Sequence, residues 1–194
     1  MRQFIKTIVP TEGYAEIKKI GNKYVVHLEG VAGEDGITTC YECMTDSEPD
    51  LTALTSELQE WKNERAARSL ELAKSQKTKE LMAYDNSSAV NEFFFSGVSM
   101  WLDKATRAGL LLRLDAEQKA GLENTTLWFG THGFTLPVAM AFQILYALEI
   151  YASQCYDNTA SHAAAIEQLT AKEDVEAYDF TTGYPEKLVL GAQP

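Results

Sequence analysis

The hydrophobic period of the chain changes at about Pro49, and this change constrains the fold more than any other feature. Before it, apolar and polar residues alternate, which is typical of strands. After it, apolar residues recur every three or four positions, which is typical of a helix. The strands predicted before it, separated by glycine-containing turns, are Gln3–Val9, Tyr14–Ile20, Lys23–Glu29 and Ile37–Met44. Residues 1–48 are therefore predicted to form a small antiparallel β unit.

Side chains of the third predicted strand alternate between two faces. Tyr24, Val26 and Leu28 fall on one face, and Lys23, Val25 and His27 fall on the other. One face is expected to pack against a core and the other to stay wet.

A long helix is predicted from Leu51 to about Tyr84, and it makes residues 49–83 a linker. Its apolar stripe consists of Leu51, Leu54, Leu58 and Trp61. The same spacing then reaches Arg65 and Arg68, so the stripe loses its apolar character. This pattern favours a linker or a weak oligomer seam over a long coiled coil. The lysine-rich run at 74–79 is expected to be a solvated face.

Residues 84–194 are predicted to form an α+β domain with two hairpins and a long helix pair. The first hairpin joins Phe93–Phe95 to Ser99–Leu102, and the second joins Thr125–Phe129 to Phe134–Leu136. Between them, Asp103 is placed to cap a helix over Lys104–Arg113, and Asp115 with Gln118 predicts a separate short helix that ends at Gly121.

The segment Val138–Ala152 is apolar almost all round its predicted helix. Such a helix is expected to be buried on two sides, by its own domain and by a partner subunit. Asp157-Asn158-Thr159 is expected to interrupt it before a second helix over Ala160–Leu169. Together with the Leu51–Trp61 stripe, this surplus of apolar surface predicts a homo-oligomer, most simply a dimer.

The charge balance excludes some classes of partner. A net charge of -11 would repel nucleic acid phosphates and anionic lipids, so neither a nucleic acid nor a membrane is an expected partner. The most apolar stretch is short for a membrane span and contains Gln143 and Glu149. No signal peptide is visible at the N-terminus, and a cytoplasmic setting is expected.

No catalytic motif, metal site or cofactor site is predicted. Cys40 and Cys43 have the spacing of a metal or redox pair, but a zinc site needs further ligands, and in a strand these two residues point to opposite faces. The acidic run of Asp46, Glu48 and Asp50 lacks the glycine and distal glutamate of a calcium loop. An enzyme with a site assembled from distant residues stays open, and it would need a deep polar pocket with a perturbed histidine or cysteine.

Aromatic residues are concentrated in the two C-terminal hairpins. Consecutive phenylalanines in a strand show both faces, which a two-stranded hairpin cannot bury alone. The residues predicted to form a contact surface are Phe93, Phe95, Trp101, Trp128 and Phe134. Core packing is an equal alternative for these side chains. For Trp128 and Phe129, alternation predicts that one packs the core and the other faces a partner.

Residues 84–188 resemble a phage and prophage domain of unknown function that occurs in tail-fibre-assembly-like proteins. The segments that carry the resemblance are YDNSSAVNEFFFSG, MWLDKATRAGL, NTTLWFG, FTLPVAMAFQILYALEIYASQCYDNTASH and VEAYDFTTGYPEKL. The resemblance covers a little over half of the chain and does not include the N-terminal β unit.

This resemblance implies a non-enzymatic protein that binds a phage tail fibre or receptor-binding protein, as an assembly chaperone or a cap at the fibre tip. A structural virion component, such as a baseplate or tail-fibre adaptor, is the alternative. The first role places the protein in the host cytoplasm during phage assembly, and the second retains it in the virion tail.

Overall fold

The computed structural model describes residues 2–191 and confirms an α+β fold, with 46% of the chain helical and 26% in strands. The chain divides into an N-terminal unit, Met1–Glu71, and a C-terminal unit, Leu72–Pro194. The division falls inside one long helix, α1 (Leu51–Asp85), where the sequence predicted a linker over 49–83. Both parts of α1 contribute buried side chains, Leu54 and Leu58 to the first unit and Leu81 to the second.

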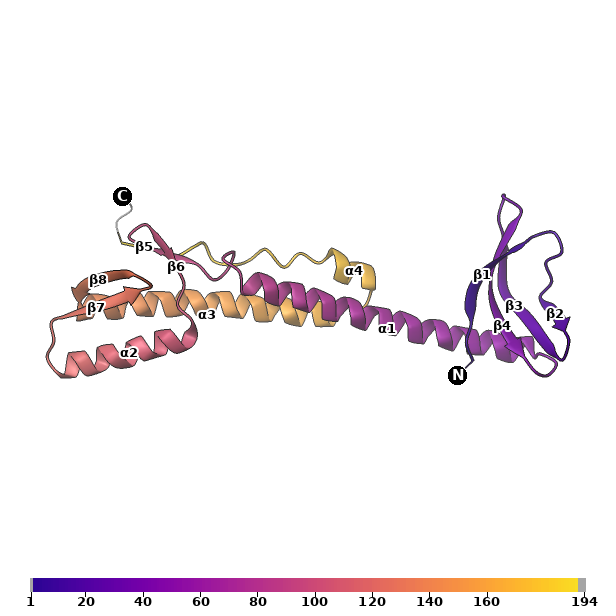
Figure 1. The fold of residues 1–194 in the computed structure, drawn as a ribbon, viewed down its shortest axis with the longest axis horizontal. Coiled ribbons are helices and arrows are strands. Elements are labelled where there is room, and N and C mark those ends of the chain that lie inside the picture. The colour runs from indigo at the N-terminus through magenta and orange to yellow at the C-terminus, as the bar shows by residue number, and fades with distance from the viewer. Residues whose placement is uncertain (1, 192–194) are drawn as a thin grey trace. The chain divides into compact units, whose positions relative to one another are not determined.

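The N-terminal unit is a four-stranded antiparallel sheet with the first turns of α1 packed on one face (Figure 1). Its strands are β1 (Ile5–Pro10), β2 (Ile17–Ile20), β3 (Lys23–Ala32) and β4 (Ile37–Thr45). The order β1-β4-β3-β2 leaves β1 and β2 at the edges. Val26 and Leu28 pack with Leu54 and Leu58 of α1, so the predicted stripe is used within the unit and is not free to form an oligomer seam.

The opposite face of this sheet is also covered at its centre, which corrects the prediction that one of the two faces stays wet. His27 is only 3% exposed and Val25 only 7%. Because β1 and β2 lie at opposite edges, the segment that joins them crosses the sheet and brings Tyr14 onto the His27 ring, with 5.6 Å between ring centroids. Gly30 makes room for this crossing, since a Cβ there would lie 2.3 Å from the Tyr14 hydroxyl.

The C-terminal unit holds the remaining strands in two small sheets. The first predicted hairpin is β5 (Phe93–Phe95) with β6 (Val98–Met100), and its two-residue turn has positive φ at both Ser96 and Gly97, as the type I′ turn requires. A parallel strand that the sequence did not predict, β9 (Val189–Leu190), pairs with β5. The second predicted hairpin is β7 (Asn124–Phe129) with β8 (His132–Pro137).

The helices of this unit are longer than predicted. α2 (Lys104–Lys119) begins at the predicted cap Asp103, but it continues through Asp115, which pairs with Lys119 inside the helix. α3 (Val138–Gln168) is one helix and not a pair. The expected break at Asp157-Asn158-Thr159 fails because polar groups in it have tertiary partners: Thr159 donates to Asp85 at 2.7 Å, and Asn158 donates to the Thr182 carbonyl at 3.0 Å. α2 and the β7–β8 hairpin both pack on α3.

The lysine-rich part of α1 is not simply a solvated face. Lys74 donates to the Glu167 carbonyl in the last turn of α3, and Lys77 donates to the Glu176 carbonyl in the last turn of the short helix α4 (Lys172–Ala177). Carbonyls at helix C-termini lack partners within the helix and carry partial negative charge, so ammonium groups stabilise them. Among residues 2–191, no helix has the length and apolarity needed to cross a bilayer.

Candidate functional site

The structure separates the five predicted contact residues into buried and accessible ones. Phe93 is fully buried and Phe95 is 8% exposed, so neither can contact a partner in this conformation. Phe134 is partly buried and packs edge-on to Phe95, with 4.8 Å between ring centroids. Trp101 is partly buried against Tyr151. Of these five residues, only Trp128, at 63% exposed, presents a large aromatic surface to solvent.

Trp128 lies over Gly133, the residue opposite it on β8. A Cβ at position 133 would lie 3.0 Å from the nearest carbons of the indole ring, so the missing side chain makes room for the tryptophan. The next residue, Phe129, is 6% exposed and packs with Phe93 and Phe95. The side chains of β7 therefore divide between the core and solvent, as alternation along a strand predicts.

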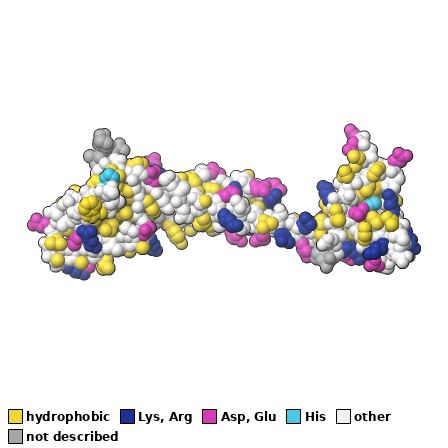
Figure 2. Space-filling model, viewed as in Figure 1, with side chains coloured by type: hydrophobic (Ala, Val, Ile, Leu, Met, Phe, Trp, Pro, Cys, Tyr) yellow, Lys and Arg dark blue, Asp and Glu magenta, His cyan; other side chains and the backbone are white. Residues whose placement is uncertain are grey.

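The outer face of β7–β8 is small and mixed in chemistry. Beside Trp128 it carries a cross-strand pair, Thr126 and Thr135, whose hydroxyl oxygens are 2.9 Å apart. On the face drawn in Figure 2, hydrophobic side chains gather over the part of the C-terminal unit that contains the hairpins. Exposed tryptophan is enriched at protein interfaces, because its ring supplies apolar area and its N–H can donate to a partner.

A polar hollow of about 410 Å³ lies beside Trp101 in the same unit. Three of its charged groups bond to neighbouring groups: Arg107, 6% exposed, donates to Glu149 at 2.5 Å and to the Leu102 carbonyl at 2.7 Å, and Asp103 accepts from the Thr106 amide. Cys155 also lines the hollow, and burial raises the pKa of its thiol. A nucleophilic cysteine requires the opposite shift, so this hollow does not have the electrostatics of a thiol enzyme.

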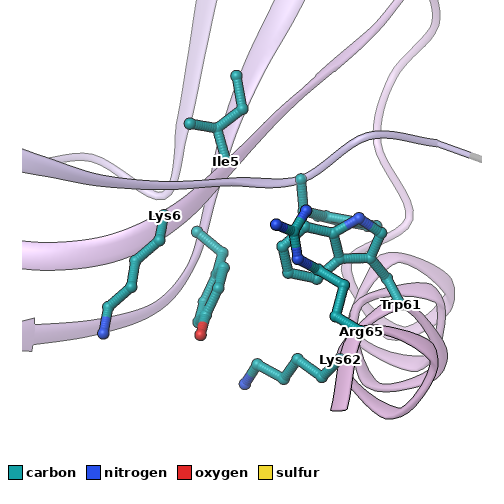
Figure 3. Close-up of a pocket in the computed structure, with 7 residues that line it drawn as sticks. Ile5, Lys6, Trp61, Lys62 and Arg65 are labelled. Carbon is teal, nitrogen blue, oxygen red and sulfur yellow. The ribbon is translucent and has the colours of Figure 1, made fainter. Parts of the chain in front are cut away.

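A second hollow, of about 460 Å³, lies in the N-terminal unit between β1, β4 and α1 (Figure 3). Its aromatic wall consists of Phe4, Tyr41 and Trp61, and both Phe4 and Tyr41 meet the Trp61 ring edge-on. Lys6 of β1 and Lys62 of α1 extend in the same direction beside it, while Ile5 points to the other side of its strand (Figure 3).

The charged residues that line this second hollow are all cations: Lys6, Lys62 and Arg65. Arg65 lies over the Trp61 ring at 4.7 Å from its centroid, and Lys62 lies over the Tyr41 ring at 4.5 Å. Lys62 also pairs with Glu29, whereas no ion pair links Lys6 or Arg65 to a carboxylate among residues 2–191. This positive cluster contrasts with the net charge of -11 of the whole chain.

The sequence pattern does not predict this basic hollow. Arg65 only ends the apolar stripe of α1 in that pattern, and Lys6 lies within a predicted strand and has no predicted role. A usable signal was present in the helix, where Trp61 and Arg65 are four residues apart and therefore lie on one face. The contribution of β1 depends on tertiary packing and has no local signal.

The cysteines are buried, and two of the histidines are hydrogen-bonded to neighbouring groups. Cys40 and Cys43 lie on opposite faces of β4, Cys43 in the core with Val26 and Cys40 beneath the other face, and burial raises the pKa of both thiols. His27 bonds to the Ala15 carbonyl and to Glu42, and His162 bonds to Tyr178 and to the Thr182 carbonyl. Within the described residues, no group of three potential metal ligands comes together.

Comparison with protein families, with curated proteins and with solved structures finds no match to this chain.

Proposed function

We propose that this protein is a non-enzymatic accessory protein of a phage tail, which binds a tail fibre or receptor-binding protein through the outer face of β7–β8. The observation that carries the proposal is the 63% exposure of Trp128 on a hairpin whose next residue, Phe129, is held in the core. The phage context comes from the resemblance of residues 84–188 and from no other source.

The hairpin has the properties that a rigid binding surface needs. Leu127, Phe129 and Leu136 fix it to α3, so Trp128 is presented on a backbone that is already ordered. An ordered aromatic side chain loses little conformational entropy on binding, and tryptophan is enriched among the residues that dominate interface energies. The remaining surface is acidic overall, which favours solubility when a partner's apolar strands are held.

A non-enzymatic role is supported by the state of the side chains that could act as nucleophiles or bases. The thiols are buried and have raised pKa values, and His27 and His162 each bond through both ring nitrogens to neighbouring groups. These groups serve packing and local structure, and they leave protein binding as the function that the accessible surfaces support best.

The proposal includes a homo-oligomer, most simply a dimer, formed through the exposed side of α3. Met140, Tyr146 and Ile150 are each more than half exposed there and lie on one side of the helix. Sedimentation velocity at micromolar concentration should show a dimer, and Ile150→Glu should convert it to a monomer without lowering the melting temperature. A wild-type monomer under these conditions would contradict this part of the proposal.

A structural virion component is the second candidate, and the separate N-terminal unit favours it, because a second core with its own surface suits an adaptor. Two experiments test the function. Co-purification with the fibre protein encoded beside this one tests binding, and lack of co-purification would contradict the proposal. Mass spectrometry of purified particles then separates a virion component, present in stoichiometric amount, from a chaperone, which is absent.

A further inference from the structure

We infer that β1 is a strand-addition site for an extended acidic segment of a partner protein, with a carboxylate of that segment held among Lys6, Lys62 and Arg65. The inference concerns the N-terminal unit and stands independently of the Trp128 surface. It follows from three features that meet at one place: an open strand edge, a cluster of cations and exposed apolar side chains.

The open edge supplies the main-chain contacts. β1 is six residues long, and it is bonded on one side to β4, while no strand among the described residues pairs with its other side. An unpaired edge carries backbone donors and acceptors that an extended peptide can satisfy, in the manner of peptides that add a strand to a sheet.

The basic hollow selects the charge of the added strand. Lys6 lies on the edge strand itself, and Lys62 and Arg65 reach the same hollow from α1. No carboxylate lines the hollow, and of its three cations only Lys62 has a carboxylate partner, Glu29. An acidic side chain opposite Lys6 would therefore gain charge-assisted contacts with Lys6 and Arg65 that the described residues of the unit do not supply. Phe4, Tyr41 and Trp61 form the wall against which the methylene groups of that side chain would pack.

Apolar side chains continue the surface along the strand. Ile8 follows Lys6 by two positions, so both side chains lie on the face of the hollow. Ile8 is 65% exposed, and Val31, which shares its cross-strand neighbour Thr39, is 68% exposed. The matching segment therefore has an acidic residue and, two positions along, an apolar residue.

A second copy of this chain is a poorer occupant. Both edges of the sheet carry lysines, Lys6 on β1 and Lys18 and Lys19 on β2, so edge-to-edge pairing of two copies would bring ammonium groups together. Lysines on an edge strand prevent such pairing, and this protection alone would explain Lys6. It does not explain Arg65 and Lys62, which extend from α1 and not from an edge strand. These two cations distinguish a binding site from a merely protected edge.

Titration of the ¹⁵N-labelled full chain with the eight-residue peptide Thr-Glu-Thr-Val-Thr-Glu-Thr-Val tests the inference, because its Glu and Val residues are two positions apart and lie on one face of an extended strand. The expected result is a Kd below about 1 mM, with shifts confined to β1 and the hollow and slowed hydrogen exchange of β1 amides. Lys6→Glu and Arg65→Glu should each weaken binding at least about tenfold, whereas Lys18→Glu, the same charge change on the other edge, should not. A peptide with Lys in place of Glu should not bind.

Several results would overturn the inference: no binding at millimolar peptide, equal binding by the Lys6→Glu and Arg65→Glu variants, or equal shifts from sodium acetate alone, which would mean an anion site without strand addition. Concentration-dependent pairing of β1 between copies would also overturn it. Trp128→Ala should leave peptide binding unchanged, so the failure of this inference and the failure of the proposed fibre binding give different results.

Discussion

Trp128 and Phe129 are neighbours on β7 with opposite surroundings: the Trp128 ring is 63% exposed and lies over Gly133, and the Phe129 ring is 6% exposed with its centroid 6.0 Å from that of Phe95. One residue shows its side chain to solvent, and the next fixes the hairpin to the core. Phe129 therefore stabilises the hairpin, and Trp128 is the residue whose side chain a partner can contact.

The first prediction concerns the stability of these two positions. Phe129→Ala should lower the free energy of unfolding by about 3 to 5 kcal/mol, because it leaves a cavity among Phe93, Phe95 and Phe134. Trp128→Ala should lower it by less than about 1 kcal/mol, because a largely exposed side chain loses little buried area. Urea denaturation followed by circular dichroism measures both values, and similar losses in the two variants would contradict this division.

The second prediction concerns the ion pair between buried Arg107 and partly exposed Glu149. Arg107 is 6% exposed, and it bonds both to Glu149 and to the Leu102 carbonyl. In a double-mutant cycle with Arg107→Met and Glu149→Gln, the double variant should be more stable than the sum of single losses predicts, by about 1 kcal/mol. Glu149 is 40% exposed, so solvent screening keeps this coupling modest. A coupling energy of zero would mean that the pair does not act as a unit.

The third prediction tests the lysines that meet helix ends. Lys77→Met keeps most of the apolar stem but removes the donor to the Glu176 carbonyl, and it should lower stability by about 1 kcal/mol. Hydrogen exchange of residues 172–178 should quicken in this variant. Lys79→Met is the matched control, since Lys79 is exposed, and its effect should stay within about 0.5 kcal/mol. Equal effects of the two changes would show that Lys77 does not cap α4.

The sequence predicted which helices and strands form better than it predicted where they end and what they contact. Alternation identified all four strands of the first sheet, and the spacing of Leu51, Leu54 and Leu58 identified α1. The break predicted in α3 failed because the Thr159 hydroxyl bonds to Asp85, which is 74 positions away in the chain. Local pattern cannot reveal such a partner. For the same reason, the two-residue strand β9 and the basic hollow could not be predicted.

The prediction for the contact surface shows the same limit. Alternation established that Trp128 and Phe129 point to opposite faces, but it could not say which face is covered. Phe93 and Phe95 have equal aromatic character and are buried because α3 and the second hairpin pack on them. The composition therefore predicted that the aromatic residues concentrate in the hairpins, but tertiary packing decides that Trp128 is the most exposed of the five predicted contact residues.

The fourth prediction concerns the thiols. Burial raises the pKa of Cys40, Cys43 and Cys155, so the thiolate fraction at pH 8 is lower than that of a free cysteine with a pKa near 8.5. All three should react with a disulfide reagent much more slowly in the native protein than in denaturant. Mass spectrometry after timed labelling at pH 8 reports each cysteine. Native labelling of any of them at the rate of an unfolded cysteine would show that it is accessible.

The fifth prediction tests the proposed binding surface, and calorimetric titration of the fibre protein into wild type and Trp128→Ala is the most direct measurement of it. Gly133→Ala, whose added Cβ displaces the indole ring, should weaken binding in the same direction as Trp128→Ala. Tyr156→Ala is the matched control, because Tyr156 is another exposed aromatic of the same unit, at 71% exposed, outside the hairpin.

We predict that Trp128→Ala costs about 2 kcal/mol or more of binding free energy, roughly 30-fold in Kd, while its melting temperature stays close to that of the wild type and Tyr156→Ala binds normally. Wild-type affinity in the Trp128→Ala variant would contradict the claim that the outer face of β7–β8 is the binding surface.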